Sequence, residues 1–406
     1  MKIKNHPTRT TIIIFLYLAN LAGCQTPRSF VEEGKPLLSR PGVVAVDVEE
    51  RRKTLSQLPS TVFACGSFFN EIPVFTDLDA PSGYGLDRRY TRVAKALRQA
   101  GSACLGGAEP ACKIIQSGAL SWAQKTQDLL PMGAPGSSKF WNDTLTINMR
   151  LLGPMATMLS VAEAVTPMKP ADRAIVDTWL KSKVDSFEHG MRNEGDYKGG
   201  SSGTTARRAA HNHAAQSSIA AMSYGAWVGD EDYFRTGLEQ WSITLDSMRD
   251  DGSLPIETRR GSRALFYHGR TISALVQIAE RARVQGIDLY GKPTWGVGSI
   301  HHAVTFFINA VINPSIVLPY AKTNHVPGPS KDYTRQDLGG RGTLGWIAPY
   351  MARFPNHPNT LRLRKVNGSE SYLTPGVEAA VLGKSGASEW IGVDARCFYA
   401  DFGDDL

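Results

Sequence analysis

The chain has 406 residues, of which 42% are hydrophobic, and a formal net charge of +7. This length suits one large domain or two small ones. We expect the N-terminal segment to be cleaved off. It contains the basic residues Lys2, Lys4 and Arg9 and no acidic residue, so its removal lowers the net charge from +7 to +4. So mildly basic a chain does not call for nucleic acid as a partner. It is compatible with a polyanion that meets a local cluster of basic side chains.

Residues 1–23 have the features of an export signal. After the basic start, residues 12–18 are apolar, and the small residues Ala22 and Gly23 stand directly before Cys24. This order is typical of a secretory signal, and the apolar run is too short for a permanent membrane-spanning helix. Residues 21–24 also resemble the lipobox of bacterial lipoproteins, which implies a lipid on Cys24. The alternative is an ordinary secretory signal that leaves Cys24 as a free thiol.

The signal sets the expected location and the boundaries of the chain. Gln25, not Asp, follows Cys24, and by resemblance to Gram-negative sorting signals this favours the outer membrane, facing the periplasm or the cell surface. We therefore predict a signal peptide at 1–23 and a lipidated tether with an N-terminal arm at 24–60. Residues 61–406 are expected to form a single domain.

Four further cysteines follow the proposed cleavage site. An even number in an oxidising compartment suggests two disulfides. Cys104 and Cys112 flank a Gly-Gly-Ala-Glu-Pro turn, so a local pair between them is natural, and Cys65 with Cys397 would then link the two ends of the chain. Metal binding is the weaker alternative because no Cys-x-x-Cys spacing occurs. The sequence leaves the connectivity open.

From about Asp87 onward the chain is a succession of helical patterns. The first begins with an Asp cap and carries Tyr90, Val93, Ala94 and Leu97 on one stripe. Similar stripes separated by short turns predict helices at 87–100, 112–130, 141–164, 171–191, 206–227, 231–248, 262–285 and 295–312. Residues 376–382 also fit a helix better than a strand.

Eight or more helices joined by short turns leave two architectures, a solenoid or a closed toroid of helical hairpins. A solenoid generally shows a sequence repeat, and none is visible here. We therefore predict an all-α fold in one domain, an α/α toroid or incomplete α/α barrel, with a cleft at one end. Two longer irregular stretches, at 195–205 and 320–342, are expected beside that cleft.

The first candidate site residues are His211, Asn212 and His213, which open one of the predicted helices. Asn and His are unusual where a helix prefers Ala or Leu. One interpretation is a polar helix start with local hydrogen bonds only. Metal binding by His211 and His213 is less favoured because residues two apart point to different helix faces.

A second candidate segment, residues 250–268, holds three arginines, a Tyr and a His around a turn that enters an apolar helix. On a helix, Arg260, Arg263 and Tyr267 are three and four residues apart, so one face can gather all three. Positive charge beside a Tyr favours its phenolate form. The alternative is a solvated basic helix start whose arginines pair with nearby carboxylates, and we adopt that interpretation for Arg259.

These segments contain motifs that resemble a known family. In chain order they are Asn-His at 212–213, Asp-Gly-Ser-Leu-Pro-x-Glu at 251–257, Arg-Ala-Leu-x-Tyr-His at 263–268 and Trp-x-x-Pro-Tyr at 346–350. Their order and separation resemble the alginate lyases of polysaccharide lyase family 5 over residues 205–355. The resemblance implies a lyase that cleaves an acidic polysaccharide, alginate or polymannuronate first and a glucuronan-type polymer second.

By position, the resemblance places the functional Asn, His, Arg and Tyr of the family at Asn212, His213, Arg260 and Tyr267. The further candidates for substrate contact are Arg263, His268, Trp346 and Tyr350.

This chain departs from the family pattern in two places. Ala215 and Gln216 stand where the family usually has Tyr-Trp, and the N-terminal Lys of the family has no counterpart around residues 77–89. Both departures bear on which substrate is bound.

The chemistry of β-elimination fits these residue types. The uronate carboxylate must be neutralised before the C5 proton can leave, and Asn212, His213 and Arg260 supply the donors. In manno- and gluco-configured uronates the base and the acid act from the same side, so Tyr267 can do both, with Arg260 easing its ionisation. For guluronate, His213 can be the base from the opposite face. No metal or cofactor is required.

Two other functions are open. A glycoside hydrolase needs two carboxylates across the scissile bond, and Asp250, Asp251 and Glu257 could supply them, although neighbouring arginines would lower the pKa that a general acid needs. A non-catalytic polysaccharide-binding lipoprotein would explain the two departures from the family, but not the retained Asn, His, Arg and Tyr.

Overall fold

The structure is a computed structural model that describes residues 30–31, 34–57, 65, 85–125, 151–193, 210–291, 298–321, 327–338, 344–364 and 392–399. These residues form helices and connecting turns, with no β-strand among them. The long helices are α2 (Gly85–Leu105), α3 (Glu109–Gln124), α5 (Gly153–Val165), α6 (Pro170–Asn193), α7 (Asn212–Val228), α8 (Glu231–Asp246), α10 (Ala264–Val284) and α11 (Ile300–Ile312). The predicted all-α class is confirmed.

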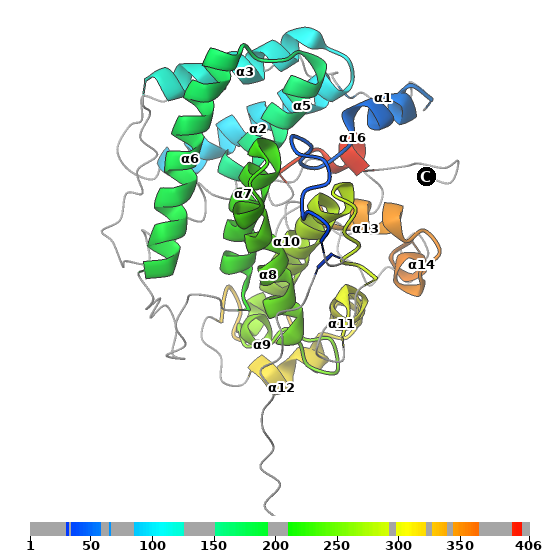
Figure 1. Cartoon of the computed structure of the whole chain (residues 1–406). Helices are drawn as coiled ribbons and strands as arrows, with labels where there is room; N and C mark the ends of the chain where they lie inside the picture. The colour runs from blue at the N-terminus through cyan, green and yellow to red at the C-terminus, as the bar shows by residue number, and fades with distance from the viewer. Residues whose placement is uncertain are drawn as a thin grey trace, which may run out of the picture.

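Short helices complete the described part of the chain. They are α1 (Val48–Gln57), α9 (Pro255–Thr258), η4 (Gly261–Arg263), η5 (Pro314–Val317), α12 (Leu318–Ala321), α13 (Ile347–Arg353), α14 (Pro358–Arg364) and α16 (Ala395–Tyr399). Helices that follow one another pack as pairs, namely α2 with α3, α7 with α8 and α10 with α11. Helix α7 packs on α5 and on α10, so it links neighbouring pairs near the centre of the molecule (Figure 1).

Helix α8 illustrates how the local sequence forms these hairpins. Gly229 ends α7 with a φ of 86°, and the Asp230 carboxylate then accepts hydrogen bonds from the backbone N–H groups of Asp232 and Tyr233. This cap satisfies donors that the first turn leaves without helical partners. From there, Phe234, Leu238, Trp241 and Leu245 bury one stripe of α8, which is the apolar face of a helix packed on one side.

Helices α7 and α10 are buried on nearly all sides. A helix buried all round normally has apolar residues on every face. The exceptions are therefore informative, because a buried polar side chain is stable only when it is hydrogen-bonded. They include Asn212 and Gln216 on α7 and Arg270 and Thr271 on α10.

The N-terminal arm packs on the helical body. Backbone N–H groups of Leu37 and Gly42 donate to Glu231 Oε1 and to the Ala226 carbonyl, both at 2.8 Å, and Arg51 donates to the Cys397 carbonyl at 2.7 Å. Val44 and Val46 are buried. Of the predicted tether and arm at 24–60, residues 34–57 thus form part of the folded body.

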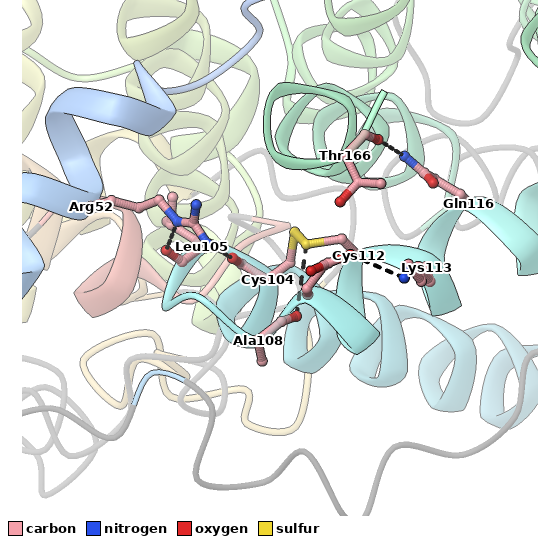
Figure 2. The surroundings of a disulfide bond; sticks show 9 residues. Arg52, Cys104, Leu105, Ala108, Cys112, Lys113, Gln116 and Thr166 are labelled. Atoms are coloured by element: carbon pink, nitrogen blue, oxygen red, sulfur yellow. Dashed lines mark hydrogen bonds and ion pairs between the residues drawn. A yellow bond between two sulfur atoms is a disulfide. The ribbon is translucent and has the colours of Figure 1, made fainter. Parts of the chain in front are cut away.

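Both expected disulfides are present. Cys104 and Cys112 join the end of α2 to the start of α3, and Cys65 joins Cys397 across 332 residues. Figure 2 shows Arg52 beside the first bond, where its guanidinium donates to the carbonyls of Cys104 at 3.3 Å and Leu105 at 3.1 Å. The arm and the α2–α3 turn are therefore fixed to each other.

Several helix boundaries differ from the prediction. Helix α7 begins at Asn212 rather than 206, α10 begins at Ala264 rather than 262, and α11 begins at Ile300 rather than 295. Cys24, residues 195–205 and residues 376–382 lie outside the described residues. Within the described ranges, no helix combines the length and the apolar character needed to cross a membrane.

Candidate active site

A histidine caps the N-terminus of α7. His211 has an extended backbone, and its ring Nδ1 accepts hydrogen bonds from the backbone N–H groups of His213 at 3.1 Å and Ala214 at 3.2 Å. The imidazole takes the place of the Ser, Thr, Asp or Asn usual at this position. Burial lowers the pKa of His211 to about 4, against an opposing effect of Glu257. The cap is therefore neutral near pH 7, as an accepting Nδ1 requires.

The first residue of α7, Asn212, is bound to the buried carboxylate of Glu257. Its backbone N–H donates to Oε1 at 2.6 Å, and its side-chain Nδ2 lies 3.0 and 3.2 Å from the two carboxylate oxygens. Thr271 on α10 donates to the same carboxylate at 3.3 Å. Asn212 and Glu257 are fully buried. Glu257 on α9 thus connects the start of α7 to α10.

Arg260 links this carboxylate to Tyr267. Its Nε lies 3.4 Å from Glu257 Oε2, and its guanidinium carbon lies 4.3 Å from the centre of the Tyr267 ring. Phe266 packs edge-on against that ring, with 4.9 Å between the ring centres. Tyr267 is partly exposed, and its hydroxyl makes no hydrogen bond to the described residues. Asn212, Arg260 and Tyr267 are therefore brought together around Glu257.

The expectation that Arg260, Arg263 and Tyr267 share one helix face is wrong. Gly261 adopts a φ of 55°, residues 261–263 form the 3-10 turn η4, and α10 begins only at Ala264. Arg260 precedes this turn, so it reaches the Tyr267 ring from outside the helix. Arg263 instead lies 3.9 Å from Asp337, where the two side chains are 40% and 34% exposed.

Part of the predicted irregular stretch at 320–342 packs beside this turn. The Ser262 N–H donates to the Pro327 carbonyl at 2.9 Å, and the Leu265 N–H donates to Gln336 Oε1 at 3.1 Å. Gly328 has a φ of 74°, and a Cβ there would lie 2.5 Å from Cγ of Arg263. Only glycine allows this close approach. Residues 327–338 therefore cover the turn that leads to Tyr267.

His213 is partly exposed and lies next to the His211 ring, at 5.6 Å between ring centres. Enclosure by the protein lowers the pKa of His213 well below its ordinary value, and His211, Arg270 and Arg260 act in the same direction. His213 is therefore a neutral imidazole near pH 7. A neutral imidazole can accept a proton or donate one hydrogen bond.

Two residues of this site were missed as site candidates in the sequence. Arg270 places its guanidinium carbon 5.7 Å from the centre of the Tyr267 ring and 5.3 Å from that of Phe266. Gln216 accepts from Arg270 Nη2 at 3.4 Å. A signal was present, since Gln216 follows Asn212 by four residues and Arg270 follows Tyr267 by three, and such spacings share a helix face.

Three expected substrate contacts lie in the core instead. His268 bonds through Nε2 to the Ala303 carbonyl at 3.0 Å and lies against Phe306 and Phe307. Trp346 and Tyr350 are fully buried, and the Tyr350 hydroxyl lies 2.7 Å from His301 Nδ1. These positions give no support to direct contact with a substrate. Burial also lowers the pKa of His268 to about 4, so it is a neutral core side chain.

The Cys, His, Asp and Glu side chains of the described ranges form no group of three or more that could hold a metal ion.

Comparisons with known proteins find similarity to polysaccharide lyases. The sequence profile of the Alginate lyase family matches residues 130–317. A polysaccharide lyase from Stenotrophomonas maltophilia is 30% identical over 146 residues, which are 36% of this chain and 38% of that protein. An alginate lyase from Azotobacter vinelandii is 28% identical over 155 residues, 38% of each chain. The matched part therefore spans well under half of these curated relatives.

Solved structures share the fold over a much larger part. Alginate lyase A1-III from Sphingomonas species A1 has a TM-score of 0.61 and 24% identity, covering 80% of this chain and 91% of that chain. A variant of A1-III solved with a tetrasaccharide has a TM-score of 0.65 and 21% identity, covering 91% and 100%. These α/α-toroid enzymes confirm the predicted fold. Residues 130–317 of this chain are thus similar to the Alginate lyase family, and the described residues share the fold of alginate lyase A1-III.

Proposed function

We propose that this protein is a polysaccharide lyase that cleaves an acidic uronate polymer, alginate or polymannuronate first, by β-elimination. The observation that carries the proposal is the arrangement of Tyr267. Its hydroxyl makes no hydrogen bond to the described residues, and its ring centre lies 4.3 Å from the Arg260 guanidinium carbon, next to the network that holds Asn212. The names of the relatives and the tetrasaccharide in an A1-III variant support the same class of reaction.

The first requirement of the reaction is to neutralise the carboxylate beside the C5 proton. Arg260 supplies a positive charge, and His213 and Asn212 supply neutral donors. The Nδ2 of Asn212 faces both oxygens of the Glu257 carboxylate, and a single N–H can be shared between them, so one amide hydrogen is left over. Because Asn212 is fully buried, this hydrogen serves the substrate only when substrate binding uncovers the side chain. The Asn212 side-chain oxygen is buried without a hydrogen-bond partner in the described region.

Tyr267 then acts as base and acid in turn. Its phenolate oxygen takes the C5 proton, the electron pair of that bond forms the C4–C5 double bond, and the C4–O4 bond breaks. The phenol returns the proton to the departing O4, so the enzyme is regenerated and one product chain carries a 4,5-unsaturated uronate. His213, neutral at working pH, takes the place of the base when the C5 proton lies on the other face. Protein side chains supply every step, so the proposed reaction uses no metal or cofactor.

A hydrolase is the less favoured alternative. Glu257 is fully buried and bound to Asn212 and Thr271, so it is not positioned to protonate a glycosidic oxygen. Burial raises the pKa of Asp251, but the hydrogen bonds from Ser253 and Tyr320 outweigh this effect and lower it overall. A carboxylate with a lowered pKa is a poor general acid at neutral pH.

The test is incubation with mannuronan, glucuronan and mixed alginate, measuring both new reducing ends and the ultraviolet absorbance of unsaturated uronate. We expect both signals to rise together on at least one polymer. Reducing ends without absorbance would indicate hydrolysis, and binding with neither signal would indicate a non-catalytic protein.

We further propose that Cys24 carries a lipid that anchors the enzyme in the outer membrane, facing the periplasm or the cell surface. The signal-like residues 1–23 and the lipobox-like residues 21–24 support this. Fractionation tests it, since the wild-type chain should sediment with outer membranes and Cys24→Ala should not. Recovery of wild-type protein in the soluble periplasm would contradict the anchor.

A further inference from the structure

The second arginine beside Tyr267 takes no part in the proton transfers. Arg270 is 6% exposed and lies on α10, one turn after Tyr267. A buried guanidinium carries a large desolvation cost, so its position is strongly determined by its surroundings. Its side chain lies against the rings of Phe266 and Tyr267, at 5.3 and 5.7 Å.

Gln216 fixes Arg270 through both ends of its amide. The amide oxygen accepts from Arg270 Nη2 at 3.4 Å, and the amide nitrogen donates to the Arg270 backbone carbonyl at 3.5 Å. Gln216 is fully buried on α7, one turn after Asn212. The pair therefore forms a second connection between α7 and α10, next to the Asn212–Glu257–Thr271 connection.

These two connections hold together the helices that carry the two proposed proton-transfer groups. His213 lies on α7 between Asn212 and Gln216, and Tyr267 lies on α10 between Arg260 and Arg270. The charged and titratable groups that act on His213 are His211 on its own segment, Arg260 before η4 and Arg270 on α10. His213 precedes Gln216 by three residues and so shares its face of α7. The Arg270 guanidinium, bonded to Gln216 and packed on the Tyr267 ring, therefore lies towards the helix face that carries His213.

We propose that Arg270, held by Gln216, is a positioning residue for the elimination, which fixes the Tyr267 ring and keeps a positive charge beside His213. The proposal rests on the proposed lyase function for its catalytic consequence. Its structural consequence, the charge beside His213, can be measured in the unliganded protein.

Three variants separate the two parts of this role. Arg270→Met removes the charge and the contact with the ring, Arg270→Lys keeps the charge, and Gln216→Leu keeps the guanidinium but removes its support. The matched control is Arg281→Lys, a buried arginine farther along α10 that donates to Ser223 at 2.7 Å and Thr157 at 3.1 Å. It tests for the effect of merely weakening a buried arginine. Thermal unfolding checks that each variant is folded.

We expect Arg270→Met to lower kcat by about 100-fold, the effect of a displacement of about 1 Å at a reacting group, while KM stays within about 2-fold. Gln216→Leu should lower kcat by roughly 10-fold, since the guanidinium remains and the Tyr267 ring is then only partly misplaced.

Because a neighbouring positive charge disfavours protonation of an imidazole, Arg270→Met should also raise the pKa of His213 in an NMR titration. Arg270→Lys should restore that pKa and part of kcat. Arg281→Lys should lower stability only.

An unchanged kcat in Arg270→Met, or a change in KM alone, would overturn the positioning role. So would an NMR titration of His213 that is the same in Arg270→Met and wild type. If the wild type forms no unsaturated product on any polymer, the proposed lyase function fails. The NMR titration then still tests whether the Arg270 charge acts on His213, because it needs no substrate. If Arg270→Met does not fold, Gln216→Leu and Arg270→Lys carry the kinetic test.

Discussion

Two clusters of the molecule contain the same kinds of side chain and differ in what they can do. The site cluster holds Asn212, His213 and Tyr267. The second cluster, formed by residues of α11, α13 and α14, holds Asn359, His301 and Tyr350, with His357 stacked on His301 at 4.3 Å between ring centres. An Asn, a His and a Tyr are thus brought together twice, and residues of both clusters fall in motifs that point to the same family.

The clusters differ in charge and in access to the Tyr hydroxyl. Tyr350 is fully buried, its hydroxyl lies 2.7 Å from His301 and 3.3 Å from Asn359, and burial raises its pKa to about 12. Tyr267 is partly exposed and has the guanidinium groups of Arg260 and Arg270 within 4.3 and 5.7 Å of its ring. Two features therefore set Tyr267 apart from Tyr350, the adjoining cations and the partial exposure of its side chain.

The two tyrosines provide the largest expected contrast. Tyr267→Phe should lower kcat by about 1,000-fold, because a positioned acid–base group contributes roughly 10² to 10⁴. Tyr350→Phe should leave kcat within a few-fold and cost about 1–2 kcal/mol of stability, because His301 and Asn359 lose a partner. Lyase kinetics and thermal unfolding of both variants measure this. Full activity in Tyr267→Phe would remove the proposed mechanism, whatever the substrate.

The two buried asparagines provide the next contrast. Asn212→Ala should lower kcat/KM by about 100-fold, the effect of losing one donor to a developing oxyanion. Asn359→Ala removes a donor to the His301 carbonyl at 3.0 Å and an acceptor for Thr305 at 3.0 Å, so it should cost about 1–3 kcal/mol of stability and little activity. Equal losses of activity in the two variants would show that the clusters are not distinct in function.

Acid should destabilise the second cluster by protonating its neutral histidine His301. Burial, with His357 and His302 adding to it, lowers the pKa of His301 to about 4. The folded state therefore binds fewer protons than the unfolded state, so this stability is present above about pH 6.5 and is lost as the pH falls towards 4. His301→Gln should make the fall in unfolding free energy shallower in that window, by clearly less than about 1.4 kcal/mol per pH unit because solvent screens this partly exposed side chain. Chemical denaturation at several pH values measures the slope, and a variant with an unchanged slope would contradict the shifted pKa.

The smallest effect is expected at Arg263. Its ion pair with Asp337 is long, at 3.9 Å, and both partners are well exposed, and such pairs contribute about 0–1 kcal/mol. Arg263→Ala should therefore change stability by less than about 1 kcal/mol and leave kcat unchanged. A large loss of kcat would move the site towards residues 327–338 and away from Arg270.

Much of the fold follows from the sequence, because apolar stripes and caps are local signals. The apolar stripe of α8 predicts a helix at 231–248, close to the observed Glu231–Asp246, and Asp230 caps its start. The pattern places the start of α7 six residues early because the actual cap is His211, which is outside the usual capping set. The start of α10 is also predicted early, since Gly261 and the 3-10 turn η4 interrupt the spacing that suggested one face for Arg260 and Arg263.

The candidate site was predictable to a smaller extent. The predicted meeting of Asn212, Arg260 and Tyr267 is observed. The connecting role of Glu257 is not predicted, because the sequence suggests this residue only as an ion-pair partner or as a hydrolase acid. Burial decides the remaining cases, since nothing in the sequence shows that Phe306 and Phe307 enclose His268 or that His301 takes the Tyr350 hydroxyl. Such contacts join helices far apart in the chain, so periodicity cannot reveal them.

The most direct test of the account is the mass of the products formed from mannuronan in water enriched in ¹⁸O. Elimination adds no water, so we predict that the new non-reducing ends are one water lighter than those of hydrolysis products and that the new reducing ends take up no ¹⁸O in the cleavage step. The same ends should be nearly absent with Tyr267→Phe. Products heavier by one water and labelled with ¹⁸O would contradict the account.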